Sequence, residues 1–140
     1  MYHFTRTNGF GEEVIRRIIL GTFVLSASYY DAYFTKAQKV RNIIRKSLSD
    51  LFSGFNYIIT PTSPVSPYKI GEVTNNPLEM YLGDLYTVIA SVAGIPAISI
   101  PAGNDSSGLP VGFQIMANEF QEMELLSFSN YILSLSHRKT

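Results

Sequence analysis

Two adjacent arginines, Arg16 and Arg17, lie inside an apolar helical pattern near the start of the sequence. Adjacent residues on a helix point about 100° apart, so one arginine can face inward while the other faces solvent. An inward guanidinium offers a planar fork that pairs bidentately with a carboxylate. The alternative is a structural ion pair with Glu12, Glu13 or Asp31, which is the commoner use of a helix arginine.

A second candidate for chemistry is Asp84, which apolar and aromatic residues flank in the segment 79–87. A carboxylate in such surroundings could bind an ammonium group. The alternative is a helix cap at a break after Gly83, because capping is a common role of aspartate. The residue types alone leave both interpretations open.

Several catalytic arrangements are absent from the sequence. There is no cysteine, and the two histidines are His3 and His137, near opposite ends of the chain. No metal-binding spacing, G-x-S-x-G motif, Walker loop or dinucleotide glycine fingerprint occurs. A Ser-His or Cys-His triad would therefore require a terminal histidine to fold back. We expect neither a catalytic residue nor a metal site in this chain.

Charge and hydropathy narrow the classes of partner. The 140 residues are 46% hydrophobic, and 11 Lys and Arg balance 11 Asp and Glu. Zero net charge argues against nucleic-acid binding through bulk charge, so the basic residues of the second expected helix are better interpreted as a solvated face than as RNA contacts. No apolar run reaches the roughly 18 residues of a membrane span, and we expect no membrane partner.

The candidate residues lie on elements that the apolar periodicity predicts. Arg17 belongs to the first expected helix, and Asp84 to a helix that a glycine interrupts. The three prolines at 61, 64 and 67 predict a stiff, extended loop that leaves the first strand. The expected elements are helices over 12–25, 29–52 and 122–135, a broken helix over 78–93 after a turn at 74–77, and strands over 56–60, 97–101 and 111–117, the last two forming a hairpin.

Several motifs resemble the amidase signature family. The first part of the chain contains GFGEEVIRRIILGT (9–22), YYDAY (29–33) and KAQKVR (36–41). These runs are similar to the A subunits of the aspartyl/glutamyl-tRNA amidotransferases within that family. The later runs AGIPAIS (93–99) and GLPVGFQ (108–114) are shared more widely across it. The resemblance extends over nearly the whole chain.

The resemblance implies a fold and an activity. It implies an α/β fold with a mixed sheet flanked by helices, of which residues 1–140 would form a single partial domain, the C-terminal portion. In the family, a Ser–cis-Ser–Lys triad within a Gly/Ser-rich signature releases ammonia from glutamine. A separate B subunit then uses that ammonia with ATP and Mg²⁺. The heterotrimer of A, B and C subunits converts Glu-tRNA(Gln) or Asp-tRNA(Asn) to Gln-tRNA(Gln) or Asn-tRNA(Asn).

The resemblance also assigns roles to the two candidates. Arg17, the second arginine of Arg-Arg-Ile, matches the residue that pairs with the α-carboxylate of glutamine, and Arg16 is expected to be structural. Asp84, in the pattern Met-Tyr-x-x-Asp, matches the residue that holds the α-ammonium group. The triad lysine and the Gly/Ser-rich signature, which in the family lie upstream, do not occur here.

From this departure we expect the chain alone to be inactive. We expect it to hold no cofactor of its own and to contact tRNA only indirectly, through the B subunit. Its expected location is the bacterial cytoplasm or, in a eukaryote, the mitochondrion or plastid. The alternatives are a fragment of another amidase-signature hydrolase, which need not retain the Arg17 and Asp84 pair, and a non-catalytic remnant or scaffold.

Overall fold

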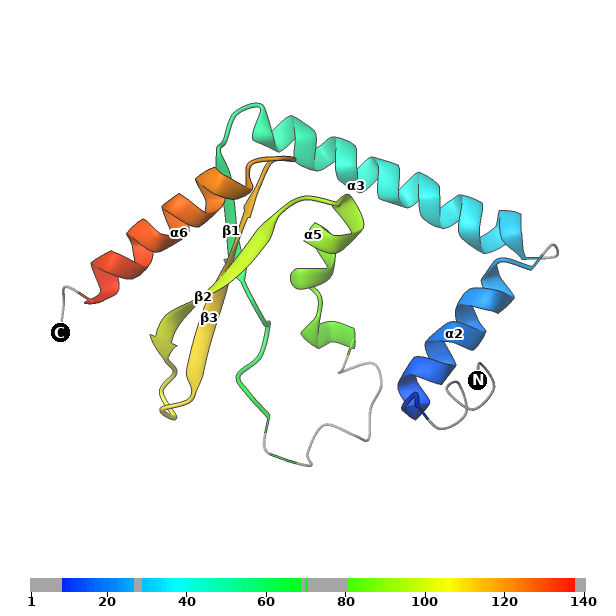
Figure 1. Cartoon of the computed structure of the whole chain (residues 1–140), viewed down its shortest axis with the longest axis horizontal. Coiled ribbons are helices and arrows are strands. Elements are labelled where there is room, and N and C mark those ends of the chain that lie inside the picture. Colours follow the sequence, from blue (N-terminus) through cyan, green and yellow to red (C-terminus); the bar gives the residue numbers. More distant parts are fainter. Residues whose placement is uncertain (1–8, 27–28, 69, 71–80, 138–140) are drawn as a thin grey trace. The chain divides into compact units, whose positions relative to one another are not determined.

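The computed structural model describes residues 9–26, 29–68, 70 and 81–137 (Figure 1). The chain divides into two compact units, Met1–Asn42 and Ile43–Thr140. The division falls inside helix α3 (Lys36–Phe52). The single partial amidase domain expected from the sequence stays a prediction.

The first unit contains helix α2 (Glu12–Val24), which confirms the helix expected over 12–25. Glu12 and Glu13 occupy its first turn, where the helix dipole favours carboxylates. No side chain of α2 is buried, and even the apolar Val14 and Ile18 are 45% and 49% exposed. The apolar stripe that the sequence pattern assigns to this helix is therefore open to solvent.

The second helix expected over 29–52 is present as two joined segments. A π-helix, η1 (Tyr30–Thr35), leads directly into α3. Aromatic pairs four residues apart line η1, with ring centroids 4.8 Å apart for Tyr30 and Phe34. Apolar residues at steps of three and four do not distinguish an α-helix from a single wider turn, so the sequence predicts the helix but not the π turn.

The second unit is built on a three-stranded sheet of β1 (Tyr57–Pro61), β2 (Ala97–Asn104) and β3 (Pro110–Ala117) in the order β1-β3-β2. The predicted hairpin of β2 and β3 is confirmed, and so is the α/β character of the fold. Both strand pairings are antiparallel, so no parallel pair is present among the described strands. Pro61 ends an edge strand, where a missing N–H costs no ladder bond.

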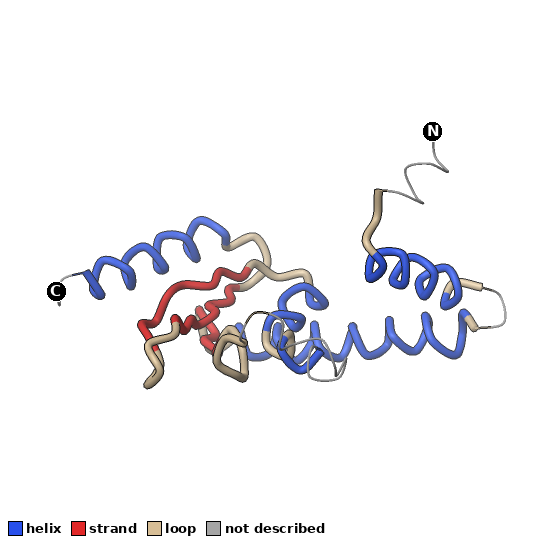
Figure 2. The backbone as a smooth tube through the Cα atoms, turned by 90° about the horizontal axis from the view of Figure 1, so that it is seen from below, coloured by secondary structure: helices blue, strands red, loops and turns tan. Residues whose placement is uncertain are grey.

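One face of the sheet is apolar and packs against helix α6 (Glu122–His137), which lies along one side of the sheet in Figure 2. The ring of Tyr57 stacks on that of Phe128 with centroids 4.2 Å apart, and the Tyr57 hydroxyl donates to the backbone carbonyl of Glu124 at 3.1 Å. The buried residues at the centre of this cluster are Ile100, Ile115, Ala117 and Leu125.

The other face carries the buried Met116 and a polar centre, because successive strand residues point to opposite sides. Helix α5 (Thr87–Ala93) contributes the buried Ala90 and Ala93. The broken helix expected over 78–93 is confirmed for residues 81–93, with turns directly after Gly83. The expected turn at 74–77 lies outside the described residues.

Helix α5 ends at Gly94, whose φ of 77° is the left-handed conformation that favours glycine. Its N–H donates to the carbonyl of Ala90 at 2.8 Å, which satisfies a free carbonyl of the last turn. This stop lets the chain reverse into β2. Within the described ranges, no helix is both long and apolar enough to cross a membrane.

The packing of the core predicts that two isoleucines paired across β1 and β3 contribute unequally to the free energy of unfolding. Ile115 is fully buried, whereas its register partner Ile59 is 54% exposed. We expect Ile115→Ala to lower the free energy of unfolding by about 3 kcal/mol, because it leaves a cavity. The matched control Ile59→Ala should lower it by less than about 1 kcal/mol. Urea unfolding followed by circular dichroism measures both, and equal losses would contradict this description of the core.

Candidate substrate-binding site

Arg16 and Arg17 both contact Glu13, one turn earlier on α2. The Nε of Arg17 donates to Glu13 Oε1 at 2.9 Å, and Arg16 donates to the other carboxylate oxygen. The hydrogen bonds from Arg16 and then from Arg17 lower the pKa of the Glu13 carboxyl. The structural ion pair that the sequence offered as an alternative is therefore present.

Neither of the two arginines faces inward within this unit. Their side chains are 56% and 64% exposed, respectively. The reason is that α2 has no buried residue, so this helix offers no interior for a side chain to face. Neighbouring helix residues still point about 100° apart, but Arg16 and Arg17 lie three and four residues after Glu13. Both side chains therefore reach its single carboxylate.

The contact with Glu13 leaves the far end of the Arg17 guanidinium available. Glu13 accepts its hydrogen bond from the Nε of Arg17, the guanidinium nitrogen nearest the helix. Within the described part of the chain, the two terminal nitrogens of Arg17 have no hydrogen-bond partner. A carboxylate ligand could approach them end-on and form two parallel hydrogen bonds while Glu13 holds the side chain.

Asp84 lies in an exposed turn between two helical segments of the second unit. Its backbone carbonyl accepts from the amide of Val88 at 3.0 Å and from the hydroxyl of Thr87 at 3.2 Å. The helix-cap interpretation is wrong for α5, because its N-cap is Tyr86 and no side chain caps it. No hydrogen bond or ion pair to the Asp84 carboxylate occurs among the described residues.

Beside this turn, the loop that follows β1 encloses a cavity of about 340 Å³ against strands β2 and β3. A smaller cavity lies between the same loop and the residues just before Asp84, and Tyr68, Leu82 and Gly83 are among the residues that line it. The Tyr68 hydroxyl lies 3.9 Å from where a Cβ on Gly83 would be. The hydroxyl groups that line the larger cavity, called here the hydroxyl-lined cavity, belong to Thr62, Ser63, Ser66, Tyr68 and Ser99.

Hydrogen bonds fix the walls of the hydroxyl-lined cavity. The hydroxyls of Thr62 and Ser99 are 2.8 Å apart and bonded to each other. Gly112 lies beneath them, and a Cβ there would come within 3.2 Å of the Ile100 carbonyl and 3.4 Å of both hydroxyls. A side chain at this position would therefore push the strands and hydroxyls apart by a few tenths of an ångström.

The loop itself is tied to the β2–β3 turn through Asp105. Hydrogen bonds from the Leu109 amide, the Ser66 hydroxyl and the Ser107 amide lower the pKa of the Asp105 carboxyl. The two amides donate at 2.9 and 2.8 Å, respectively. An aspartate that accepts from its own turn and from a neighbouring loop joins the two segments that enclose the cavity.

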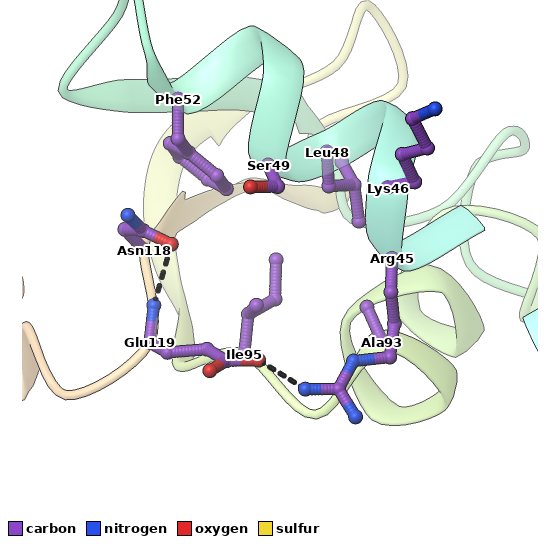
Figure 3. Close-up of a pocket in the computed structure, with 9 residues that line it drawn as sticks. All are labelled: Arg45, Lys46, Leu48, Ser49, Phe52, Ala93, Ile95, Asn118 and Glu119. Carbon is purple, nitrogen blue, oxygen red and sulfur yellow. Dashed lines mark hydrogen bonds and ion pairs between the residues drawn. The ribbon is translucent and has the colours of Figure 1, made fainter. Parts of the chain in front are cut away.

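A third cavity, of about 470 Å³, lies between α3 and the chain around Ile95 and Asn118 (Figure 3). Arg45 and Glu119 form an ion pair at its rim, and Ile95 points into it. Arg45 is paired with a carboxylate but its side chain is still 46% exposed, which agrees with the solvated face interpreted from the sequence. Lys46 also lines this cavity, so its lining carries two cationic side chains and one carboxylate.

The two residues predicted from the sequence lie in different units, Arg17 in the first and Asp84 in the second. Their convergence on one ligand stays a prediction. The hydroxyl-lined cavity was not predicted, although Thr60 on β1, Thr62 just after it and Ser99 on β2 could have indicated a polar sheet face. Among the described residues, no group of three or more His, Cys, Asp or Glu side chains could hold a metal ion.

Comparison with known proteins identifies the family. The model of the Amidase family matches residues 1–126, which is most of the chain. The chain belongs to the amidase family. A crystal structure of an amidase with 20% sequence identity has a TM-score of 0.69, covers 91% of this chain and 29% of its own, and agrees with that fold.

Within the family, the chain is similar to A subunits of tRNA-dependent amidotransferases, as the motifs indicate. The A subunit of the glutamyl-tRNA(Gln) amidotransferase of Prosthecochloris aestuarii is 56% identical over 126 residues, which are 90% of this chain and 26% of that protein. The crystal structure of the corresponding A subunit from Thermotoga maritima shares 50% identity with a TM-score of 0.65, over 89% of this chain and 27% of that one. The chain thus spans about a quarter of the length of these relatives.

Because Arg16 and Arg17 share the carboxylate of Glu13, replacing each of them should raise the Glu13 pKa by a different amount. Because the hydrogen bond from Arg16 lowers the Glu13 pKa most, Arg16→Ala should raise that pKa further than Arg17→Ala. Each variant should leave Glu13 ionised over a narrower pH range than in the unaltered chain. A carbon-detected NMR titration of the side-chain carboxyl measures the three values. A larger rise for Arg17→Ala would contradict the described geometry.

Proposed function

We propose that this chain provides the glutamine-holding groups of the A subunit of a tRNA-dependent amidotransferase. The observation that carries the proposal is the 56% identity to such a protein across most of the chain. In the proposed role, Arg17 pairs with the α-carboxylate of glutamine and Asp84 with its α-ammonium group. The Arg17 fork, held from the side by Glu13 and open at its end, supports this assignment.

Two opposite charges explain how the site would select its substrate. Free glutamine carries a carboxylate and an ammonium group at a fixed separation, whereas a plain amide carries neither. A site with one cation and one anion at matching positions therefore favours the amino acid. Loss of one partner of such a desolvated pair typically costs about 2–5 kcal/mol.

The chemistry of hydrolysis belongs to residues outside this sequence. A Gly/Ser-rich signature with its Ser–cis-Ser–Lys triad would supply the nucleophile, and the ammonia would pass to the B subunit. ATP and Mg²⁺ would act there, the C subunit would complete the heterotrimer, and tRNA would be bound through the B subunit. In this proposal the chain itself holds no cofactor, and the assembly works in the bacterial cytoplasm or in an organelle of bacterial descent.

Two other functions remain as alternatives. A different amidase-signature hydrolase would act on another amide and would have no use for the Arg17 and Asp84 pair. A non-catalytic remnant or scaffold would bind a partner protein and not glutamine. The effect of substituting the two charged residues on glutamine use separates the main proposal from both.

The first prediction of the proposal concerns the chain alone. We expect the purified chain to release no ammonia from glutamine, because it lacks the triad. Activity should return when the chain is co-expressed with the part of the P. aestuarii protein that precedes the matched segment, a combination called here the reconstituted enzyme. A coupled ammonia assay measures both. Glutaminase activity of the purified chain above background would refute this.

The second prediction separates the two arginines in the reconstituted enzyme. Arg17→Ala should lower kcat/KM for glutamine by at least about a hundredfold, because the α-carboxylate of glutamine would lose its charged partner in the site. Arg16→Ala is the matched control, one residue away on the same exposed helix, and should lower it less than about threefold. Asp84→Asn should resemble Arg17→Ala. Similar losses for both arginine variants would contradict the assigned roles.

A further inference from the structure

Gln114 is a buried polar residue at the centre of the sheet, with only 4% of its surface exposed. It lies on β3, directly opposite Thr60 on one side and Ser99 on the other. Its neighbours along the strand, Phe113 and Ile115, belong to the apolar cluster on the other face. A buried amide is costly unless its hydrogen bonds are satisfied, so its partners show what it holds in place.

The side-chain amide of Gln114 joins two separate segments. Its Nε2 donates to the Thr60 hydroxyl at 3.4 Å and to the backbone carbonyl of Tyr86 at 3.2 Å. Thr60 is on the neighbouring strand, but Tyr86 is the N-cap residue of α5, outside the sheet. The shorter of the two bonds therefore connects the sheet to the start of that helix.

This connection lies two residues from Asp84. The carbonyl of Asp84 accepts from Val88, and its amide donates to Tyr81 at 3.3 Å, so residues 81–88 form one hydrogen-bonded turn. The far end of α5 packs through the apolar Ala90 and Ala93. At its start, by contrast, the carbonyl of Tyr86 accepts the hydrogen bond from Gln114. A group bound to the start of α5 can set the position of the Asp84 carboxylate, although it never contacts the ligand.

We propose that Gln114 is a positioning residue that holds the Asp84 turn against the sheet and thereby fixes the carboxylate that meets the ammonium group of the substrate. This inference rests on the proposed function of Asp84 and adds the group that orients it. Because Asp84 would contact the ammonium equally before and during hydrolysis, its misplacement should raise KM and leave kcat nearly unchanged.

The test uses the reconstituted enzyme with Gln114→Met, which keeps the length of the side chain and removes both donors. We expect KM for glutamine to rise roughly tenfold, as for the loss of one buried hydrogen bond, with kcat changed less than about twofold. The KM for a simple amide substrate without an α-ammonium group should not change. Thr60→Val is the matched control, since it removes the other partner of Gln114 and leaves the bond to Tyr86 intact.

A second measurement on the 140-residue chain reports the turn without any activity. Gln114→Met should speed hydrogen exchange of the Val88 amide, which donates to Asp84, and Thr60→Val should not. If Asp84→Asn raises KM but Gln114→Met changes neither KM nor Val88 exchange, the inference is overturned and the proposed function stands. If neither variant changes KM, the proposed function is overturned, and the inference that rests on it falls as well.

Discussion

Strand β3 pairs with both other strands, and its two-residue alternation decides what each face of the sheet carries. Ile115 points into the apolar cluster under α6, while the adjacent Gln114 points to the face where α5 begins. The same strand therefore supplies the core on one side and a polar anchor on the other. A shift of one residue in register would exchange these sets and bury the amide among apolar side chains.

The two charged residues proposed to hold glutamine are stabilised in different ways. Arg17 is fixed by Glu13 through an exposed contact within one helix, which contributes little to stability in water. Asp84 depends on a turn whose backbone is bonded internally and to the sheet. An exposed arginine becomes a strong carboxylate ligand only where water is excluded, so the strength of this clamp depends on what covers α2 during catalysis.

The elements of the fold could largely be predicted, because helices such as α6 and strands such as β3 show clear apolar periodicity. The wide turn of η1 could not, since its aromatic spacing fits an α-helix equally well. The motifs identified Arg17 and Asp84, but not the environment of either. Contacts such as that between Arg45 and Glu119, 74 residues apart, depend on packing, and periodicity carries no information on which distant residues meet.

The strand order has a consequence for the chain as it is synthesised. β1 is made first, yet its described partner in the sheet is β3, and β2 reaches β3 through a short turn. During translation, β1 is therefore made well before residues 110–117 exist to pair with it. Throughout that interval Tyr57, Ile58 and Ile59 lack their partners on β3, and the ring of Tyr57 also lacks Phe128 of α6, on which it stacks. The nascent chain thus carries an unpaired strand edge for as long as it takes to make the hairpin.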